Sequence, residues 1–121
     1  MPCSPSDTVY FIIASAQAAR GCEVTIAGEK FFVATIDGKR VTYISTASPE
    51  FTTPEGIRVG AKFPDIVRVR GSEIVGEVGW RYFSVLPSGW CAMYSGIPGV
   101  DTLGGIVLAR DSTVVELFRR E

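Results

Sequence analysis

The sequence contains no histidine and no long hydrophobic run. The missing histidine removes the usual general base, the Ser–His and Cys–His nucleophile pairs, and the commonest metal ligand. No apolar stretch approaches the roughly 20 residues that a membrane-spanning helix needs. We therefore expect no metal site, no cofactor and no membrane span.

An excess of charge of one sign is also missing. The chain has 12 basic and 13 acidic residues, a net charge of −1, and no segment that concentrates lysine or arginine. Because nucleic-acid-binding proteins carry a basic patch or stripe, we expect no nucleic-acid partner. The acidic residues lie mostly at turns, and no spacing singles out an acid and base pair. We interpret them as solvated surface charge. This interpretation favours a protein without catalytic activity over an enzyme.

The sequence is rich in apolar residues. With 121 residues, of which 46% are hydrophobic, the chain has the length of one domain and enough apolar material for a core. The pattern predicts a single α+β domain over residues 1–121, with residues 1–7 disordered. Its expected elements are an N-terminal helix, an antiparallel meander, a short helix at about 64–70 and C-terminal hairpins.

The N-terminal segment is predicted to be an amphipathic helix. Apolar residues follow the spacing i, i+3, i+4 and i+7 over Val9–Ala16. Ser6 or Asp7 can cap the N-terminus of this helix, and Gly21 can end it. Two alternatives stay open, the remnant of a signal peptide and a leading strand.

From Cys22 the apolar pattern changes to alternation, which is typical of strands. Gly28 is expected to turn the first strand into the second. Asp37-Gly38 supplies a two-residue type I′ turn between the second and third strands. The expected pairs across that turn are Ala34 with Val41 and Phe32 with Tyr43. The result is a three-stranded meander over about 23–46.

The middle of the chain is expected to be a shaped connection. Pro49 and Pro54 interrupt regular structure, and Gly56 and Gly60 permit tight turns around an apolar pair. That pair is Ile57 and Val59, which we expect to enter the core. For the segment that follows, Ile66, Val67 and Val69 favour a strand, whereas Pro64, Asp65 and Gly71 favour a short helix with a buried stripe of Phe63, Ile66 and Val67.

Two hairpins are predicted in the C-terminal half, with turns at Pro87–Gly89 and Asp111-Ser112. The expected pairs are Phe83 with Met93, Ser84 with Ala92, Val85 with Cys91, Leu86 with Trp90, Ala109 with Val114, and Leu108 with Val115. In the first hairpin neither face is polar. One face has Phe83, Val85, Cys91 and Met93, and the other has Trp80, Tyr82, Leu86, Trp90 and Tyr94.

The aromatic face suggests two classes of function. Either the protein's own helices or a second sheet layer cover it, or a partner covers the surface of Trp80, Tyr82, Trp90 and Tyr94. The second interpretation predicts a binding or interaction domain, most simply a two-fold homodimer. The competing interpretation is a ligand-binding protein or enzyme with a pocket between sheet and helix, which uses carboxylates and Arg58, Arg68 or Arg81.

The three cysteines allow more than one interpretation. Cys22 and Cys91 alternate with apolar companions, which favours two buried thiols. A disulfide between them is the alternative if the compartment is oxidising. Cys3 is expected to be a free thiol in a disordered terminus, and the alternative is a former acylation site of a lipoprotein.

A resemblance to a known family rests on short motifs between Ile44 and Leu117. The chain reads Ile44-Ser-Thr, then Phe51-x-Thr-Pro-Glu-Gly-Ile-x-Val-Gly, then a segment ending at Gly71, then Tyr82-Phe-x-x-Leu-x-x-Gly-Trp. This pattern resembles small bacterial domains of the SmpA outer-membrane-lipoprotein and β-lactamase-inhibitor-like type. The resemblance implies a short helix packed on an antiparallel meander and favours an extracytoplasmic location. It implies no catalytic or binding residue.

Overall fold

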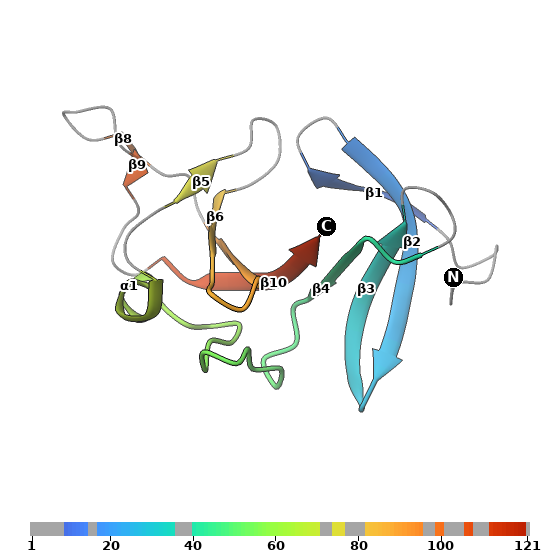
Figure 1. Ribbon diagram of the computed structural model, residues 1–121, viewed down its shortest axis with the longest axis horizontal. Helices are drawn as coiled ribbons and strands as arrows, with labels where there is room; N and C mark the ends of the chain where they lie inside the picture. The colour runs from blue at the N-terminus through green and yellow to red at the C-terminus, as the bar shows by residue number, and fades with distance from the viewer. Residues whose placement is uncertain are drawn as a thin grey trace.

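Eight strands form one antiparallel sheet in the computed structural model, which describes residues 9–14, 17–35, 40–70, 74–76, 82–95, 99–100, 106–107 and 112–120 (Figure 1). The strands of this sheet are, in spatial order, β1 (Val9–Ala14), β2 (Gln17–Ile26), β3 (Glu29–Thr35), β4 (Tyr43–Thr46), β10 (Val114–Arg120), β7 (Cys91–Tyr94), β6 (Tyr82–Val85) and β5 (Val75–Gly76). A separate pair joins β8 (Gly99–Val100) to β9 (Ile106–Val107). The described residues contain one helix, α1 (Phe63–Arg70). The fold is therefore mostly antiparallel sheet with one short helix.

The predicted N-terminal helix is wrong in this structure, where the segment forms β1 and pairs with β2. Tyr10 lies opposite Arg20, and Phe11 lies opposite Ala19. All six residues of β1 are apolar, so they match the helical spacing and every other spacing equally well. Their β-branched and aromatic side chains favour a strand, which was one of the alternatives. The expected disorder of residues 1–7 lies outside the described residues.

The meander is present, but the pairing between β3 and β4 is shifted by two residues from the predicted register. Ala34 pairs with Tyr43, and Phe32 pairs with Ser45 instead of Tyr43. A shift of two residues leaves every side chain on its expected face, so hydrophobic alternation cannot distinguish the two registers. The Asp37-Gly38 turn itself lies outside the described residues.

The first turn of the meander lies at Gly28, as predicted, and the structure shows that it is a two-residue turn. Ile26 pairs with Glu29 across it. Ala27 has a φ of 52° and Gly28 has a φ of 86°. Positive φ at both central residues is the geometry of a type I′ turn, which matches the twist of the flanking strands.

The C-terminal hairpin at Pro87–Gly89 has the predicted register, whereas the second hairpin differs. Phe83 pairs with Met93 and Val85 pairs with Cys91. β10 lies between β4 and β7 in the sheet. The expected pairing of Val114 with Ala109 is wrong, because the N–H of Val114 donates to Ala61 and its carbonyl accepts from Gly60. Leu108 and Ala109 lie outside the described residues.

Two hydrophobic clusters occupy opposite faces of the strands around β10. The front face carries a cluster of Ala19, Ala34, Tyr43, Phe83, Cys91, Met93 and Phe118. The back face carries a cluster of Ile57, Ile66, Leu86, Ala92, Tyr94, Val114 and Leu117. The consecutive residues Leu117 and Phe118 point to different faces, as alternation along a strand requires, and both are completely buried.

The connection, residues 47–62, and α1 cover the back face. In Figure 1 the green connection runs from the end of β4 past β10 to α1. Ile57 from the connection and Ile66 from the helix are buried, at 5% and 0% exposure. The predicted helical stripe holds for Ile66 and partly for Phe63, but Val67 is 39% exposed. No helix in the described part of the chain is long and apolar enough to cross a membrane.

Candidate functional site: a groove between the connection and helix α1

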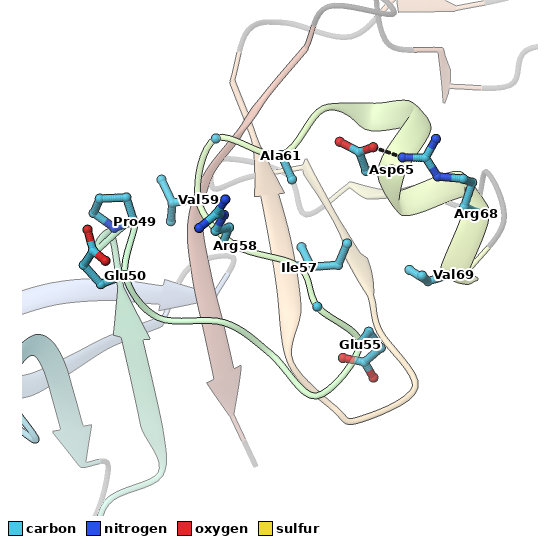
Figure 2. A pocket seen from close by; sticks show the side chains of 12 residues that line it. Pro49, Glu50, Glu55, Ile57, Arg58, Val59, Ala61, Asp65, Arg68 and Val69 are labelled. Carbon is cyan, nitrogen blue, oxygen red and sulfur yellow. Dashed lines mark hydrogen bonds and ion pairs between the residues drawn. The ribbon is translucent and has the colours of Figure 1, made fainter.

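A groove of about 680 Å³ lies between the connection and α1 (Figure 2). It is lined by Pro49, Glu50, Glu55, Gly56, Ile57, Arg58, Val59, Gly60, Ala61, Asp65, Arg68 and Val69. Ligand pockets commonly have volumes of about 300–1,000 Å³. This groove combines carboxylates with Arg58 and Arg68, the residue types expected for a pocket between sheet and helix. Arg81, the third expected arginine, lies outside the described residues.

A closed turn from Thr53 to Ile57 shapes one end of the groove. The N–H of Thr53 donates to the carbonyl of Ile57 at 2.8 Å, and the N–H of Gly56 donates to the carbonyl of Thr53 at 2.9 Å. Pro54 sits at the second position of this turn, where its fixed φ fits. Gly56 has a φ of 86°, a conformation that favours glycine. The turn therefore brings Ile57 down into the back-face cluster and presents Glu55.

Glu55 joins this turn to the β6–β7 hairpin. Its carboxylate accepts the backbone N–H of Ser88 at 2.6 Å and the Ser88 hydroxyl at 2.9 Å. Burial raises the pKa of Glu55, but the hydrogen bonds from Ser88, the backbone and Thr53 outweigh it, so the net pKa lies below the ordinary value. Glu55 is therefore held as a carboxylate that fixes the position of the hairpin turn.

A second turn, Arg58 to Ala61, attaches the connection to β10. The N–H of Ala61 donates to the carbonyl of Arg58 at 3.0 Å. Gly60 at the third position has a φ of 97°, as a type II turn requires. The N–H of Gly60 donates to Val114 at 2.8 Å, and Val114 donates to the carbonyl of Ala61 at 2.7 Å. The wall that carries Arg58 is thus bound directly to the central strand of the sheet.

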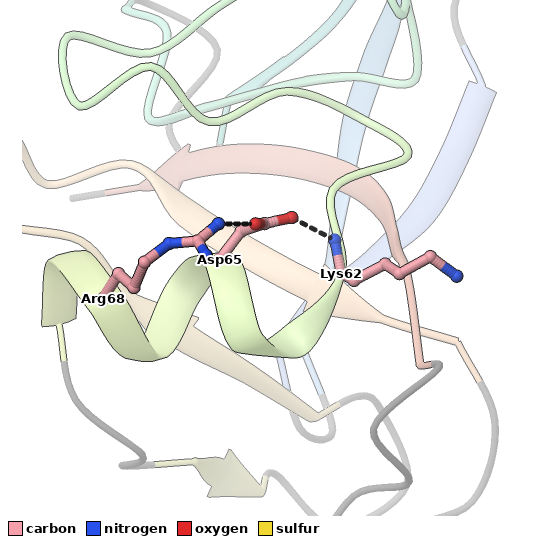
Figure 3. A network of polar contacts seen from close by, with 3 residues as sticks. All are labelled: Lys62, Asp65 and Arg68. Atoms are coloured by element: carbon pink, nitrogen blue, oxygen red, sulfur yellow. Dashed lines mark hydrogen bonds and ion pairs between the residues drawn. The ribbon is translucent and has the colours of Figure 1, made fainter.

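Asp65 fixes the start of α1 at the other end of the groove (Figure 3). Its side chain accepts the backbone N–H of Lys62 at 2.9 Å, which is the reciprocal half of a helix capping box. The same carboxylate forms an ion pair with Arg68, one turn further along the helix. Both Asp65 and Arg68 are therefore engaged within α1.

Two charged side chains of the groove are uncommitted. Within the described part of the chain, the Arg58 guanidinium and the Glu50 carboxylate make no hydrogen bond or ion pair. In Figure 2 Arg58 extends from the wall of the groove on the side of Pro49 and Glu50. Ile57, Val59 and Ala61 supply apolar surface between the charged ends. The groove thus offers one free cation and one free anion beside apolar walls.

The predicted aromatic surface is mostly covered by the protein's own chain. Tyr94 is 6% exposed, contacts Phe63 with ring centroids 5.5 Å apart, and donates from its hydroxyl to Ser84 at 2.6 Å. Burial raises the pKa of the Tyr94 phenol, and the Ser84 bond lowers it in part. Trp90 is half-buried and packs on Phe51 with centroids 4.8 Å apart. The connection and α1 therefore cover these two rings.

Tyr82 is the aromatic side chain of this set that remains open, at 38% exposure. Trp80 lies outside the described residues. The homodimer and protein-partner interpretations remain predictions. Within the described residues, Tyr82 and the outer part of Trp90 are the surface left for them.

The states of Cys22 and Cys91 differ in part from the sequence-based predictions. Cys91 is a buried free thiol, so a Cys22–Cys91 disulfide is not formed. The two side chains also lie on opposite faces of the sheet. Cys91 pairs with Phe118 and belongs to the front-face cluster. Cys22 pairs with Val33, which points away from that cluster because its neighbour Ala34 belongs to it. Cys22 is buried and disulfide-bonded, so the favoured prediction of two buried thiols holds for Cys91 and is wrong for Cys22. The prediction for Cys3 lies outside the described residues.

The chain shows no significant match to any protein-family model, curated protein or solved structure. The resemblance to SmpA-like and β-lactamase-inhibitor-like domains therefore stays a prediction, and no residue role is taken from it. Sequence reasoning named Arg58 and Arg68 but missed Glu50, Glu55 and Asp65 as groove residues. The Thr-Pro-Glu-Gly order was the available signal for Glu55, since it is typical of a tight turn that presents its third residue.

Proposed function

We propose that the protein binds a small amphoteric molecule in the groove between the connection and α1. The proposal rests on one observation: at a groove with apolar walls, the Arg58 guanidinium and the Glu50 carboxylate have no partner among the residues that the structure describes. Arginine binds a carboxylate through two parallel N–H donors, and a glutamate accepts from an ammonium group. A ligand with both charges and a compact apolar body fits this arrangement best.

The engaged carboxylates favour binding over acid–base chemistry in this groove. Glu55 accepts two hydrogen bonds from Ser88, and Asp65 holds Lys62 and Arg68. A general acid or base must be free to exchange its proton with the substrate. The lowered pKa of Glu55 keeps it ionised, which is the opposite of what a general acid at neutral pH needs.

The test is a two-dimensional amide NMR titration of the full chain with three probes that share a phenyl ring. L-phenylalanine carries both charges, phenylacetate is the anion and phenethylammonium is the cation. We expect L-phenylalanine to shift the amide signals of Gly60 and Ala61 in a saturable way. Phenylacetate should bind more weakly at the same signals, and phenethylammonium should be weakest there.

The matched variants are Arg58→Gln in the groove and Arg40→Gln at an exposed position outside it. We expect Arg58→Gln to weaken binding about fivefold, the upper range for one solvent-exposed ion pair. Arg40→Gln should leave binding unchanged. Equal affinities for the two variants, or shifts at Gly60 and Ala61 that never saturate, would contradict the proposal.

A further inference from the structure

The outer edge of β2 is open over the second half of the strand. β1 pairs with β2 from Gln17 to Gly21, whereas β3 pairs with β2 as far as Ile26. Residues 22–26 therefore have a strand on one side and, among the described residues, none on the other. In Figure 1 this part of β2 runs to the tip of the β2–β3 hairpin, which projects beyond the other strands.

Two residues of this edge have backbone groups without a partner. Because Ile26 and Glu29 flank a two-residue turn, they form a hydrogen-bonded pair, and from Ile26 backward every second residue of β2 bonds to β3. The N–H and C=O groups of Glu23 and Thr25 point the other way, to the open edge. No donor or acceptor in the described part of the chain meets these groups. Such an edge can pair with another strand.

The side chains along one face of this edge are apolar. Val24 pairs with Phe31, whose ring contacts Phe51 beside the back-face cluster, so Val24 and Ile26 lie on the back face. Val24 is half-buried. Ile26 is 49% exposed, the highest value among the large apolar side chains described. A strand that pairs with this edge would cover both side chains.

We propose that the open edge of β2 pairs with the same edge of a second copy of the chain, antiparallel across a two-fold axis. The unpaired backbone groups fix the register. Glu23 exchanges two backbone hydrogen bonds with Thr25 of the partner subunit, and the symmetric pair forms two more. Val24 then faces the partner's Val24 on the axis, where the two apolar side chains cover each other.

The same register balances the charges of the contact, which favours a second copy as the occupant. On the front face, Lys30 pairs with Thr25, and Thr25 lies beside the partner's Glu23. The Nζ atom of Lys30 also lies 3.8 Å from a Glu23 oxygen of its own chain. Each copy thus contributes one lysine and one glutamate, and no two like charges are directly opposite. A two-fold axis supplies this match by symmetry.

Sedimentation equilibrium and amide hydrogen exchange of the full chain test the proposal. We expect a monomer–dimer equilibrium over about 10 µM to 1 mM, because a short strand contact is at the small end of specific interfaces. The amide protons of Glu23 and Thr25 should exchange more slowly as the protein concentration rises. The amide proton of Val24, already bonded to β3, should change much less. Exchange at Glu23 and Thr25 that is independent of concentration would overturn the proposal.

A proline variant tests the backbone contact directly. Thr25→Pro removes one N–H from the edge, and proline is tolerated in an edge strand where the N–H points outward. This variant should fold, as judged by circular dichroism, and stay monomeric. Thr25→Val keeps the N–H and the branched shape, so it is the matched control and should dimerise like the parent. A folded Thr25→Pro variant that dimerises like the parent would exclude the proposed contact.

A charge variant provides a second test that leaves the backbone intact. Glu23→Lys leaves only lysines in the front-face row and should weaken the dimer about tenfold. Tyr82→Ala, on β6, should leave it unchanged. An unaffected dimer in Glu23→Lys, or a dimer lost in Tyr82→Ala, would show that the subunits meet elsewhere. These results do not depend on ligand binding at Gly60 and Ala61.

Discussion

Glu55 and Ser88 lie 33 residues apart in the chain and are joined by two hydrogen bonds to one carboxylate. The pair links the connection to the β6–β7 hairpin. On the far side of the same turn, the Arg119 guanidinium donates to the Ser88 carbonyl at 3.1 Å. One serine thus receives contacts from the connection and from the central strand.

Replacing Glu55 by glutamine should destabilise the protein. The amide keeps one acceptor oxygen but loses the charge and the second acceptor, so we expect a loss of about 1–3 kcal/mol in the free energy of unfolding. Urea unfolding followed by circular dichroism measures it. Glu50→Gln is the control, because Glu50 has no side-chain partner among the described residues, and it should stay within about 0.5 kcal/mol of the parent.

The stabilisation by Glu55 should depend on pH in one direction. The folded-state pKa lies below the ordinary value, so the carboxylate stabilises the fold fully above the ordinary pKa of a glutamate in the unfolded chain. This contribution is lost as the pH falls through the folded-state pKa. The stability difference between the parent and Glu55→Gln should therefore be constant at neutral pH and shrink in acid. A difference that grows on acidification would contradict the assigned hydrogen bonds.

Gly60→Ala should destabilise the fold through the backbone alone. A Cβ at this position would have no heavy atom within 4 Å, yet the φ of 97° is unfavourable for an L-residue. We expect a cost of about 1–2 kcal/mol in thermal or urea unfolding. Gly60→Asn should cost less, because asparagine tolerates positive φ better than alanine. Equal costs for the two variants would point to a cause other than φ.

Ile66→Ala and Val67→Ala should differ strongly although the residues are neighbours in α1. Ile66 is completely buried, and its truncation should cost about 2–5 kcal/mol through lost burial and a cavity. Val67 is 39% exposed and should cost less than about 1 kcal/mol. Urea midpoints measure both. Similar losses of stability in the two variants would mean that α1 packs on the sheet through a different face.

The expected homodimer can be tested together with the state of Trp90. In a Trp80→Phe variant, Trp90 is the remaining tryptophan, and its contact with Phe51 should shield it from acrylamide in the monomer. Sedimentation equilibrium at tens of micromolar tests self-association, and Tyr82→Ala should weaken any dimer that uses the exposed aromatic surface. A monomer with a shielded Trp90 would assign this aromatic face to packing alone.

Local signals predicted the turns and the short helix well. Gly28, Gly56 and Gly60 all have positive φ, and each ends or shapes the segment where the sequence placed a turn. Pro64 and Asp65 favoured a helix over the strand suggested by Ile66, Val67 and Val69, and α1 forms there. These features depend on a few adjacent residues, so a single sequence contains the information.

Features that depend on contacts between distant segments could not be predicted in the same way. The six apolar residues of β1 fit a helix or a strand, and only pairing with β2 decides between them. The two-residue shift between β3 and β4 keeps every side chain on its face, so alternation carries no signal for it. The groove depends on contacts such as Glu55 with Ser88, which join distant segments and have no local pattern.

The central position of β10 has a consequence for how the fold assembles. The strands β1–β4 and β5–β7 have no direct pairing with each other, because β10 lies between β4 and β7. Each group can form its own local hairpins early, yet the two groups cannot become one sheet until residues 114–120 arrive. Joining them closes a long chain segment between β4 and β10, a step of high contact order that is slow relative to hairpin formation. A chain interrupted before Val114 should therefore hold two unjoined halves with exposed strand edges.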